Sequence, residues 1–125
     1  MRMAEAVLPN FGYLPAQIAI IRDLIRATRL PQSPSSFLAE ILTDADLDVL
    51  GREDYWTRND DLRAEWAAFG TESTDVEWYQ GQIAFLTGHR YFTPMAQSLR
   101  AAQKQANIDG LAVVLAELHA RPTLP

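Results

Sequence analysis

The sequence predicts a globular all-α protein: two observations support the all-α class, and the composition supports a globular domain. Apolar residues recur at three- and four-residue spacing, and nowhere do they alternate long enough for a strand. Gly and Pro divide the chain into helix-length segments. Hydrophobic residues make up 48% and charged residues 22%, which is typical of a globular domain. A length of 125 residues predicts one domain over 1–125, built as a single bundle of five or six helices with a frayed tail at 120–125.

Three helices are predicted in the first half of the chain, over about 3–8, 15–29 and 36–50. Pro9 ends the first of them, and Pro15 occupies the first turn of the second, where its missing N–H costs nothing. A polar linker rich in Pro and Ser separates the second from the third. The third helix is apolar almost all round, and Gly51 is placed for a left-handed C-cap. The buried stripe of the second helix is predicted to consist of Leu14, Ile18, Ile21 and Ile25.

Three more helices are predicted in the second half, over about 53–69, 74–88 and 94–118. The second of these begins with a capping box between Thr74 and Glu77. Thr93 followed by Pro94 is a strong start for the last helix. The run 107–110, Asn-Ile-Asp-Gly, is expected to bend or break that helix.

Charge and composition exclude several function classes. A net charge of −5 disfavours non-specific binding to nucleic acid, because that binding depends on neutralising phosphates. The absence of cysteine rules out a disulfide framework and a thiolate zinc site. No apolar run is long enough to span a membrane, and the first residues lack the apolar core of a signal peptide. We therefore expect a soluble, cytoplasmic protein that binds neither nucleic acid nor membrane.

Three aspartates stand out because they occur in a helix otherwise suited to the interior: Asp44, Asp46 and Asp48. Burying a carboxylate is costly unless a partner or a metal ion compensates. Helical spacing predicts that at least one of the three faces protein. Two interpretations stay open: the carboxylates pair with arginines or cap neighbouring loops, or they ligate a hard metal ion.

Four segments carry a resemblance to a known family: AVLPNFGY at 6–13, IRAT at 25–28, DADLDVLGR at 44–52 and FLTGHRYFT at 85–93. Together they resemble the C-terminal half of HD-superfamily metal-dependent phosphohydrolases, over most of the chain. The resemblance implies a helical bundle that holds a divalent metal, Mg²⁺ or Mn²⁺, through a histidine, a His-Asp dipeptide and a later aspartate. Asp46 matches that later aspartate better than Asp44 does.

The histidine half of such a site is missing from this sequence. The two histidines, His89 and His119, both follow the aspartates, and neither precedes an Asp. The resemblance therefore implies an HD-type phosphohydrolase-like protein, acting on a phosphate ester or nucleotide, that is incomplete or inactive as this chain alone. The catalytic residues stay unknown. His89 falls at a predicted helix C-terminus, which favours a capping or packing role.

A stripe of arginines runs along the second predicted helix at four- and three-residue steps: Arg22, Arg26 and Arg29. Guanidinium groups bind phosphate oxygens in pairs, so this stripe is the candidate substrate-binding surface. The alternative is a solvated face, or one that pairs with acids of a neighbouring helix.

A second function class follows from the resemblance to only the C-terminal half of an HD domain, because the helices of the other half would be absent. A half-bundle leaves apolar faces of its first helices bare, and exposed apolar surface drives association. This predicts a homo-oligomer, or a protein partner that covers the bare face. The chain would then be a non-catalytic interaction or regulatory module that dimerises or docks on a signalling protein.

Overall fold

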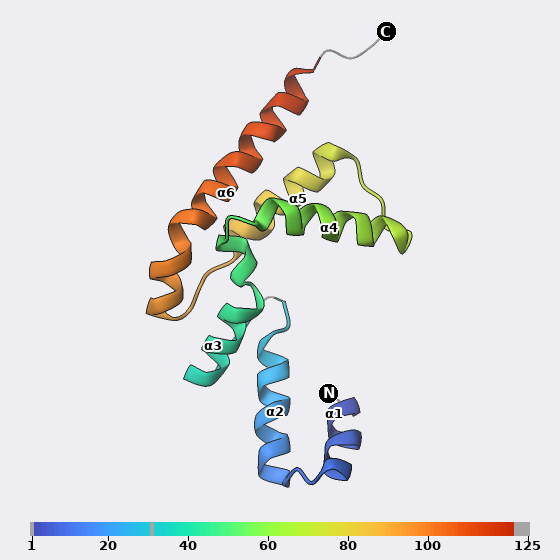
Figure 1. Ribbon diagram of the computed structural model, residues 1–125, viewed down its shortest axis with the longest axis vertical. Helices are drawn as coiled ribbons and strands as arrows, with labels where there is room; N and C mark the ends of the chain where they lie inside the picture. The colour runs from blue at the N-terminus through green and yellow to red at the C-terminus, as the bar shows by residue number, and fades with distance from the viewer. Residues whose placement is uncertain (1, 31, 122–125) are drawn as a thin grey trace. The chain divides into compact units, whose positions relative to one another are not determined.

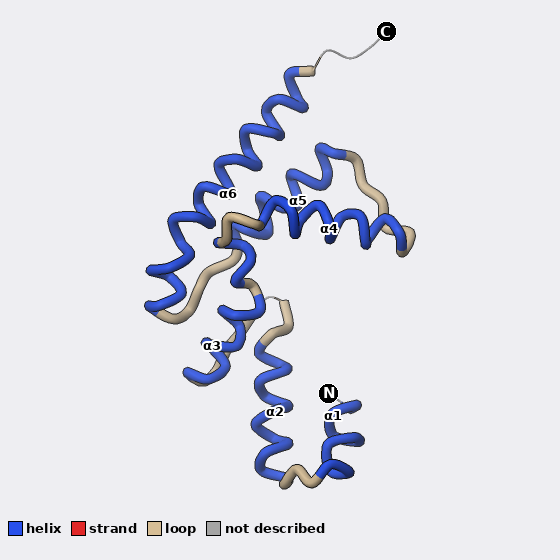
Figure 2. The backbone as a smooth tube through the Cα atoms, in the orientation of Figure 1, coloured by secondary structure: helices blue, strands red, loops and turns tan. Residues whose placement is uncertain are grey.

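The computed structural model describes residues 2–30 and 32–121, and all regular structure within them is helical, as Figure 2 shows. The all-α prediction is confirmed. The helices are α1 (Arg2–Val7), η1 (Leu8–Phe11), α2 (Pro15–Ala27), α3 (Phe37–Asp46), η2 (Asp48–Gly51), α4 (Tyr55–Ala68), α5 (Asp75–Gly88) and α6 (Pro94–Ala120), where η marks a 3₁₀ helix. They form two compact units. Unit 1 holds the described residues up to Leu47 together with Phe92–Pro94, and unit 2 holds Asp48–Tyr91 and residues 95–121.

Unit 1 is built from α1, η1, α2 and α3. Helices α1 and α2 lie side by side, and α3 packs against α2 (Figure 1). Pro9 does not end helical structure but lies inside η1, which continues directly from α1. Gly12 then turns the chain with a φ of 84°, and its N–H reaches the carbonyl of Pro9 at 3.3 Å. That left-handed conformation favours glycine, so the corner between η1 and α2 depends on this residue.

Helix α2 differs from its prediction in length and in burial. It ends at Ala27 rather than at Arg29, because the Thr28 N–H and hydroxyl both donate to the Ile25 carbonyl and tighten the last turn. The predicted buried stripe is wrong at both ends, since Leu14 and Ile25 are exposed while Ile18 and Ile21 are half-buried. Within unit 1, α2 packs against only α1, η1 and α3, and these neighbours leave both ends of the stripe uncovered.

Helix α3 begins as predicted and ends four residues early. The Ser36 hydroxyl accepts the Ala39 N–H at 3.1 Å and caps the helix. The chain leaves the helix after Asp46 and forms η2 over Asp48–Gly51. Gly51 is not left-handed, so the predicted C-cap is wrong. Its role is close packing: a Cβ there would lie 2.6 Å from both Cβ and the carbonyl oxygen of Arg100.

Unit 2 contains the larger hydrophobic core, and two aromatic contacts join α4 to α5. The Tyr55 hydroxyl donates to Gln82 Oε1 at 3.0 Å, and the Trp66 and Trp78 rings pack edge to face. Burial raises the pKa of the Tyr55 hydroxyl well above its ordinary value. The buried hydrophobic side chains of this unit are Leu50, Tyr55, Trp78, Leu86, Tyr91 and Leu111.

The break predicted at 107–110 does not occur, and α6 is continuous over its 27 residues. The fully buried Asn107 amide donates to the carbonyls of Leu50 and Arg52 at 2.9 and 3.0 Å. A Cβ at position 110 would lie 2.7 Å from the Trp56 ring. Asn107 and Gly110 therefore allow α6 to pack closely against η2 and α4. Their residue types are unfavourable in a helix, but these contacts hold the helix continuous.

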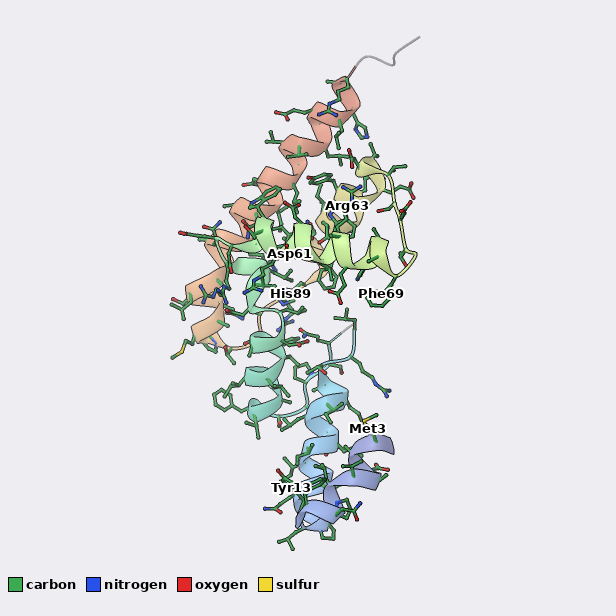
Figure 3. The ribbon with its side chains drawn as sticks, turned by 45° about the vertical axis from the view of Figure 1, so that its right-hand side comes forward. Met3, Tyr13, Asp61, Arg63, Phe69 and His89 are labelled. Carbon is green, nitrogen blue, oxygen red and sulfur yellow. The ribbon has the colours of Figure 1, made fainter. Side chains whose placement is uncertain are left out.

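The other helix boundaries of unit 2 follow local signals. The capping box between Thr74 and Glu77 is present, and α5 ends at Gly88 as predicted. Helix α4 ends beside Gly70, whose φ is 89°, and the side chain of Phe69 at that end is exposed (Figure 3). Most of the predicted tail, residues 122–125, lies outside the described residues. No helix among the described residues is long and apolar enough to cross a membrane.

Candidate functional site

Asp44 is buried, and hydrogen bonds from one short segment occupy its carboxylate. Its Oδ1 accepts the Phe92 N–H at 2.8 Å. Its Oδ2 accepts the Thr93 N–H at 2.8 Å and the Thr93 hydroxyl at 2.7 Å. These bonds join residues 48 and 49 positions apart in the sequence and lie within unit 1. The arrangement is a carboxylate that caps a loop, one of the two interpretations that the sequence left open.

The other two aspartates have different surroundings. Asp46 is exposed in the last turn of α3. Asp48 lies beyond the helix, in unit 2, where its two carboxylate oxygens accept from Arg100 at 2.7 and 3.3 Å. Arg52 approaches the same carboxylate at 3.8 Å. Within unit 1, Asp44 is therefore buried while Asp46 faces solvent.

The residues present do not fit a divalent metal ion. A cation at Asp44 would meet the partial positive charges of two backbone N–H groups and a hydroxyl hydrogen, all directed at the same oxygens. Mg²⁺ and Mn²⁺ require several oxygen or nitrogen ligands at once. No group of three or more His, Asp or Glu side chains suited to a metal occurs among the described residues.

The arginines of the predicted stripe do not converge on a phosphate-sized site. Arg22 is half-buried and lies 3.7 Å from Glu5 and 3.6 Å from Asp23. Arg26 is exposed in the last turn of α2, and Arg29 is exposed beyond the end of the helix. Arg22 therefore contacts acids of unit 1, which is one of the two alternatives, while Arg26 and Arg29 present charge to solvent.

His89 is in contact with a lysine and a tyrosine in unit 2. Lys104 Nζ lies 3.1 Å from His89 Nδ1 and donates to the His89 carbonyl at 2.6 Å. The His89 and Tyr91 rings pack edge to face, and Lys104 lies over the Tyr91 ring. Burial lowers the pKa of the Lys104 ammonium. These contacts close the segment after α5 onto α6, in keeping with the packing role predicted for His89.

An open groove of about 830 Å³ in unit 2 is lined by Gly51, Arg52, Glu53, Asp54, Leu99, Arg100, Ala102 and Gln103. Both of its arginines already pair with acids: Arg52 binds Asp54 through two nitrogens at 2.9 and 3.2 Å, and Arg100 binds Asp48. An anionic ligand would have to displace these pairs, so the groove offers little free positive charge.

Helix α3 has an unusual, inverted orientation in unit 1: it buries its small and polar side and exposes its apolar side. Its buried side chains are small or polar, with Ala39 exposed by 3% and Thr43 by 0%. The large apolar ones face outward, with exposures of 68, 53, 45 and 37% for Phe37, Leu38, Ile41 and Leu42. We call these four residues the α3 outer face. Among the described residues of unit 1, no large hydrophobic side chain is fully buried.

The sequence identified this apolar arc but not its direction. Periodicity shows which residues share a helix face, and it carries no information on which face points inward. The signal that could have indicated this orientation is the opposite arc, where Thr43 and Asp44 have polar groups that can be hydrogen-bonded when they are buried. The Gln32 amide donates to the Thr43 carbonyl at 3.2 Å and closes this inner side.

Comparisons with protein-family models, with curated proteins and with solved structures found no match to this chain. The resemblance to HD-superfamily phosphohydrolases therefore stays a prediction from the four sequence segments.

Replacing EDTA with MgCl₂ or MnCl₂ is expected to leave the thermal unfolding midpoint unchanged within about 1 °C, because a ligand stabilises only a state that binds it. Differential scanning calorimetry in each buffer measures the effect. An increase of about 5 °C that Asp46→Ala abolishes would contradict this expectation and establish a metal site at the end of α3.

Proposed function

We propose that this chain is a helical protein-interaction module and that the α3 outer face is its docking surface. The inverted orientation of α3 is the observation that carries the proposal. A helix whose interior side is Ala39 and Thr43, and whose exterior side is Phe37 and Ile41, leaves its hydrophobic surface in water. Large exposed apolar patches mark protein interaction sites, because water exclusion stabilises a complex that covers them.

Two features of unit 1 fix the orientation of α3, so the exposure of the α3 outer face is not a result of loose packing. Ser36 caps α3, so the helix has a defined start. The buried Asp44 anchors Phe92 and Thr93 to the inner side with three hydrogen bonds. Turning the apolar face inward would expose Thr43 and break the Asp44 contacts, so the present orientation is held in place.

Hydrolysis of a phosphate ester stays a prediction from the family resemblance. The described residues supply neither the histidines that the resemblance requires nor a cluster of metal ligands. The interaction module needs no such group, and the exposed apolar surface favours it.

The double variant Phe37→Glu/Leu38→Glu tests whether this face lies outward. Acidic residues in the first turn of a helix are favoured by the helix dipole, so the free energy of unfolding is expected to change by no more than about 0.5 kcal/mol. Binding of the apolar dye ANS, measured by fluorescence at about 1 µM chain, is expected to fall because the dye loses the apolar surface that these two side chains provide.

The matched control is Val113→Glu, which removes an equally exposed apolar side chain from α6 in unit 2. It is expected to keep nearly all of the ANS fluorescence. If the double variant instead loses helical circular dichroism and unfolds, the face belongs to the interior and the proposal is wrong.

A further inference from the structure

A further inference, which rests on the interaction function proposed above, concerns the occupant of the α3 outer face. We propose that α3 of a second copy of this chain packs on this face. The two α3 helices run antiparallel, and a two-fold axis passes near Ile41. Four observations bear on this: the area of the exposed surface, the distribution of charge, the polarity of the helix ends and the length of the apolar arc.

The exposed apolar area of α3 matches the apolar part of a standard interface. The four side chains of the α3 outer face present roughly 400 Å². A standard interface buries about 800 Å² per partner, and a little more than half of that area is apolar. The α3 outer face therefore supplies most of the apolar surface that such an interface requires.

The charges of unit 1 are complementary to those of a second copy. Helix α3 carries no basic residue, and its acids other than the buried Asp44 are Glu40 and Asp46. Arg26 and Arg29 lie at and just beyond the end of the neighbouring α2, are exposed, and form no ion pair among the described residues. An isologous contact brings each basic α2 end toward the acidic helix of the other copy, and it does so twice because of the two-fold symmetry.

The polarity of α3 selects the antiparallel arrangement. A parallel pair would place Glu40 and Asp46 beside the same acids of the other copy, and like charges at that separation repel. An antiparallel pair places Asp46 near the first turn of the other α3, where free backbone N–H groups carry a partial positive charge.

The apolar arc determines the register. It runs from Phe37 to Ala45, so its midpoint is Ile41. Antiparallel pairing about that midpoint sets Ile41 against Ile41, and Phe37 against Ala45 of the second copy. A parallel pair would instead set every residue against itself. Ile41 therefore faces Ile41 of the second copy in both arrangements, whereas Phe37 faces Ala45 in the antiparallel pair and Phe37 in the parallel pair.

Sedimentation equilibrium of the full chain measures the association. Between about 1 and 500 µM the wild-type chain is expected to pass from monomer to dimer, with a dissociation constant on the order of 10 µM. Phe37→Glu/Leu38→Glu is expected to raise that constant by about 100-fold, since each acid would have to be buried in the interface. Val113→Glu is expected to leave it unchanged. A monomer at all concentrations overturns the second copy as occupant.

Because the chain contains no cysteine, single introduced thiols report the register without interference. Ile41→Cys treated with a short bismaleimide is expected to form a covalent dimer. Phe37→Cys alone is expected not to form one, whereas a mixture of Phe37→Cys and Ala45→Cys chains does, and a size tag on one chain identifies the mixed product. Self-crosslinking of Phe37→Cys equal to that of Ile41→Cys overturns the antiparallel arrangement.

These outcomes separate the two proposals. A folded Phe37→Glu/Leu38→Glu variant with reduced ANS binding, combined with a wild-type chain that stays monomeric, retains the interaction face and rejects the second copy. An unfolded variant rejects the interaction face itself.

Discussion

Replacing Asp44 with alanine is expected to lower the free energy of unfolding by about 2–4 kcal/mol. The carboxylate is 6% exposed and accepts hydrogen bonds from Phe92 and Thr93, two of them from backbone N–H groups. Alanine leaves these donors without their acceptor in a site from which water is largely excluded, and each unmet donor costs its desolvation. Urea titration followed by circular dichroism measures the loss.

Amide hydrogen exchange localises the effect of Asp44→Ala, and exchange at Phe92 and Thr93 is expected to accelerate the most. The matched control is Asp46→Ala, two residues along the same helix and exposed, which is expected to change stability by less than about 0.5 kcal/mol. An Asp44→Ala chain as stable as the wild type in EDTA, and less stable only when Mn²⁺ is present, would assign Asp44 to a metal site instead.

Gly51→Ala is expected to lower the free energy of unfolding by about 2–3 kcal/mol. The added Cβ would lie 2.6 Å from Arg100 Cβ and from the Arg100 carbonyl oxygen, and 3.0 Å from the Tyr91 hydroxyl oxygen. Two of these neighbours are rigid parts of α6, so η2 and α6 must separate. That movement also weakens the bonds between Asn107 and the carbonyls of Leu50 and Arg52.

Gly81→Ala is the matched control for Gly51→Ala. Gly81 lies inside α5 with open space around the position of its Cβ, so alanine is expected to raise stability by up to about 1 kcal/mol through helix propensity. Chemical denaturation of both variants measures the contrast. A Gly51→Ala chain as stable as the wild type would show that η2 and α6 are not tightly packed in solution.

Local signals in the sequence were sufficient wherever the cause of a boundary lies within a few residues. The start of α5 depends on the contact between Thr74 and Glu77, three residues apart, and this boundary is confirmed. Pro94 in the first turn of α6 is equally local. The fold class follows from the sum of such signals, because apolar spacing and capping act within single helices.

Boundaries set by distant residues could not be predicted from one sequence. The early end of α3 and the formation of η2 bring Gly51 against Arg100, 49 positions away, and no local pattern indicates that contact. The same reason explains the error at 107–110, where Asn107 bonds to carbonyls of Leu50 and Arg52. Asn107 has low helix propensity, yet α6 continues through it because its side chain bonds to carbonyls on another part of unit 2.

The candidate site was predictable only in part. The sequence indicated that one of three aspartates faces protein, and Asp44 does so, whereas Asp46, the residue matched to the family, is exposed. The apolar arc of α3 was also visible. Its outward direction was not, because that direction depends on the donors of Phe92 and Thr93, which the chain supplies far downstream.

Unit 1 is discontinuous along the chain, since Phe92–Pro94 complete it. During synthesis, α3 therefore emerges before its anchoring residues exist, and at ordinary translation rates the interval is roughly 2 to 9 s. For that period the Asp44 carboxylate is hydrated and nothing dictates which side of α3 turns inward. The apolar side of α3 is therefore exposed in the nascent chain before Phe92 and Thr93 have been synthesised, and a chaperone that binds exposed apolar segments would meet it during that interval.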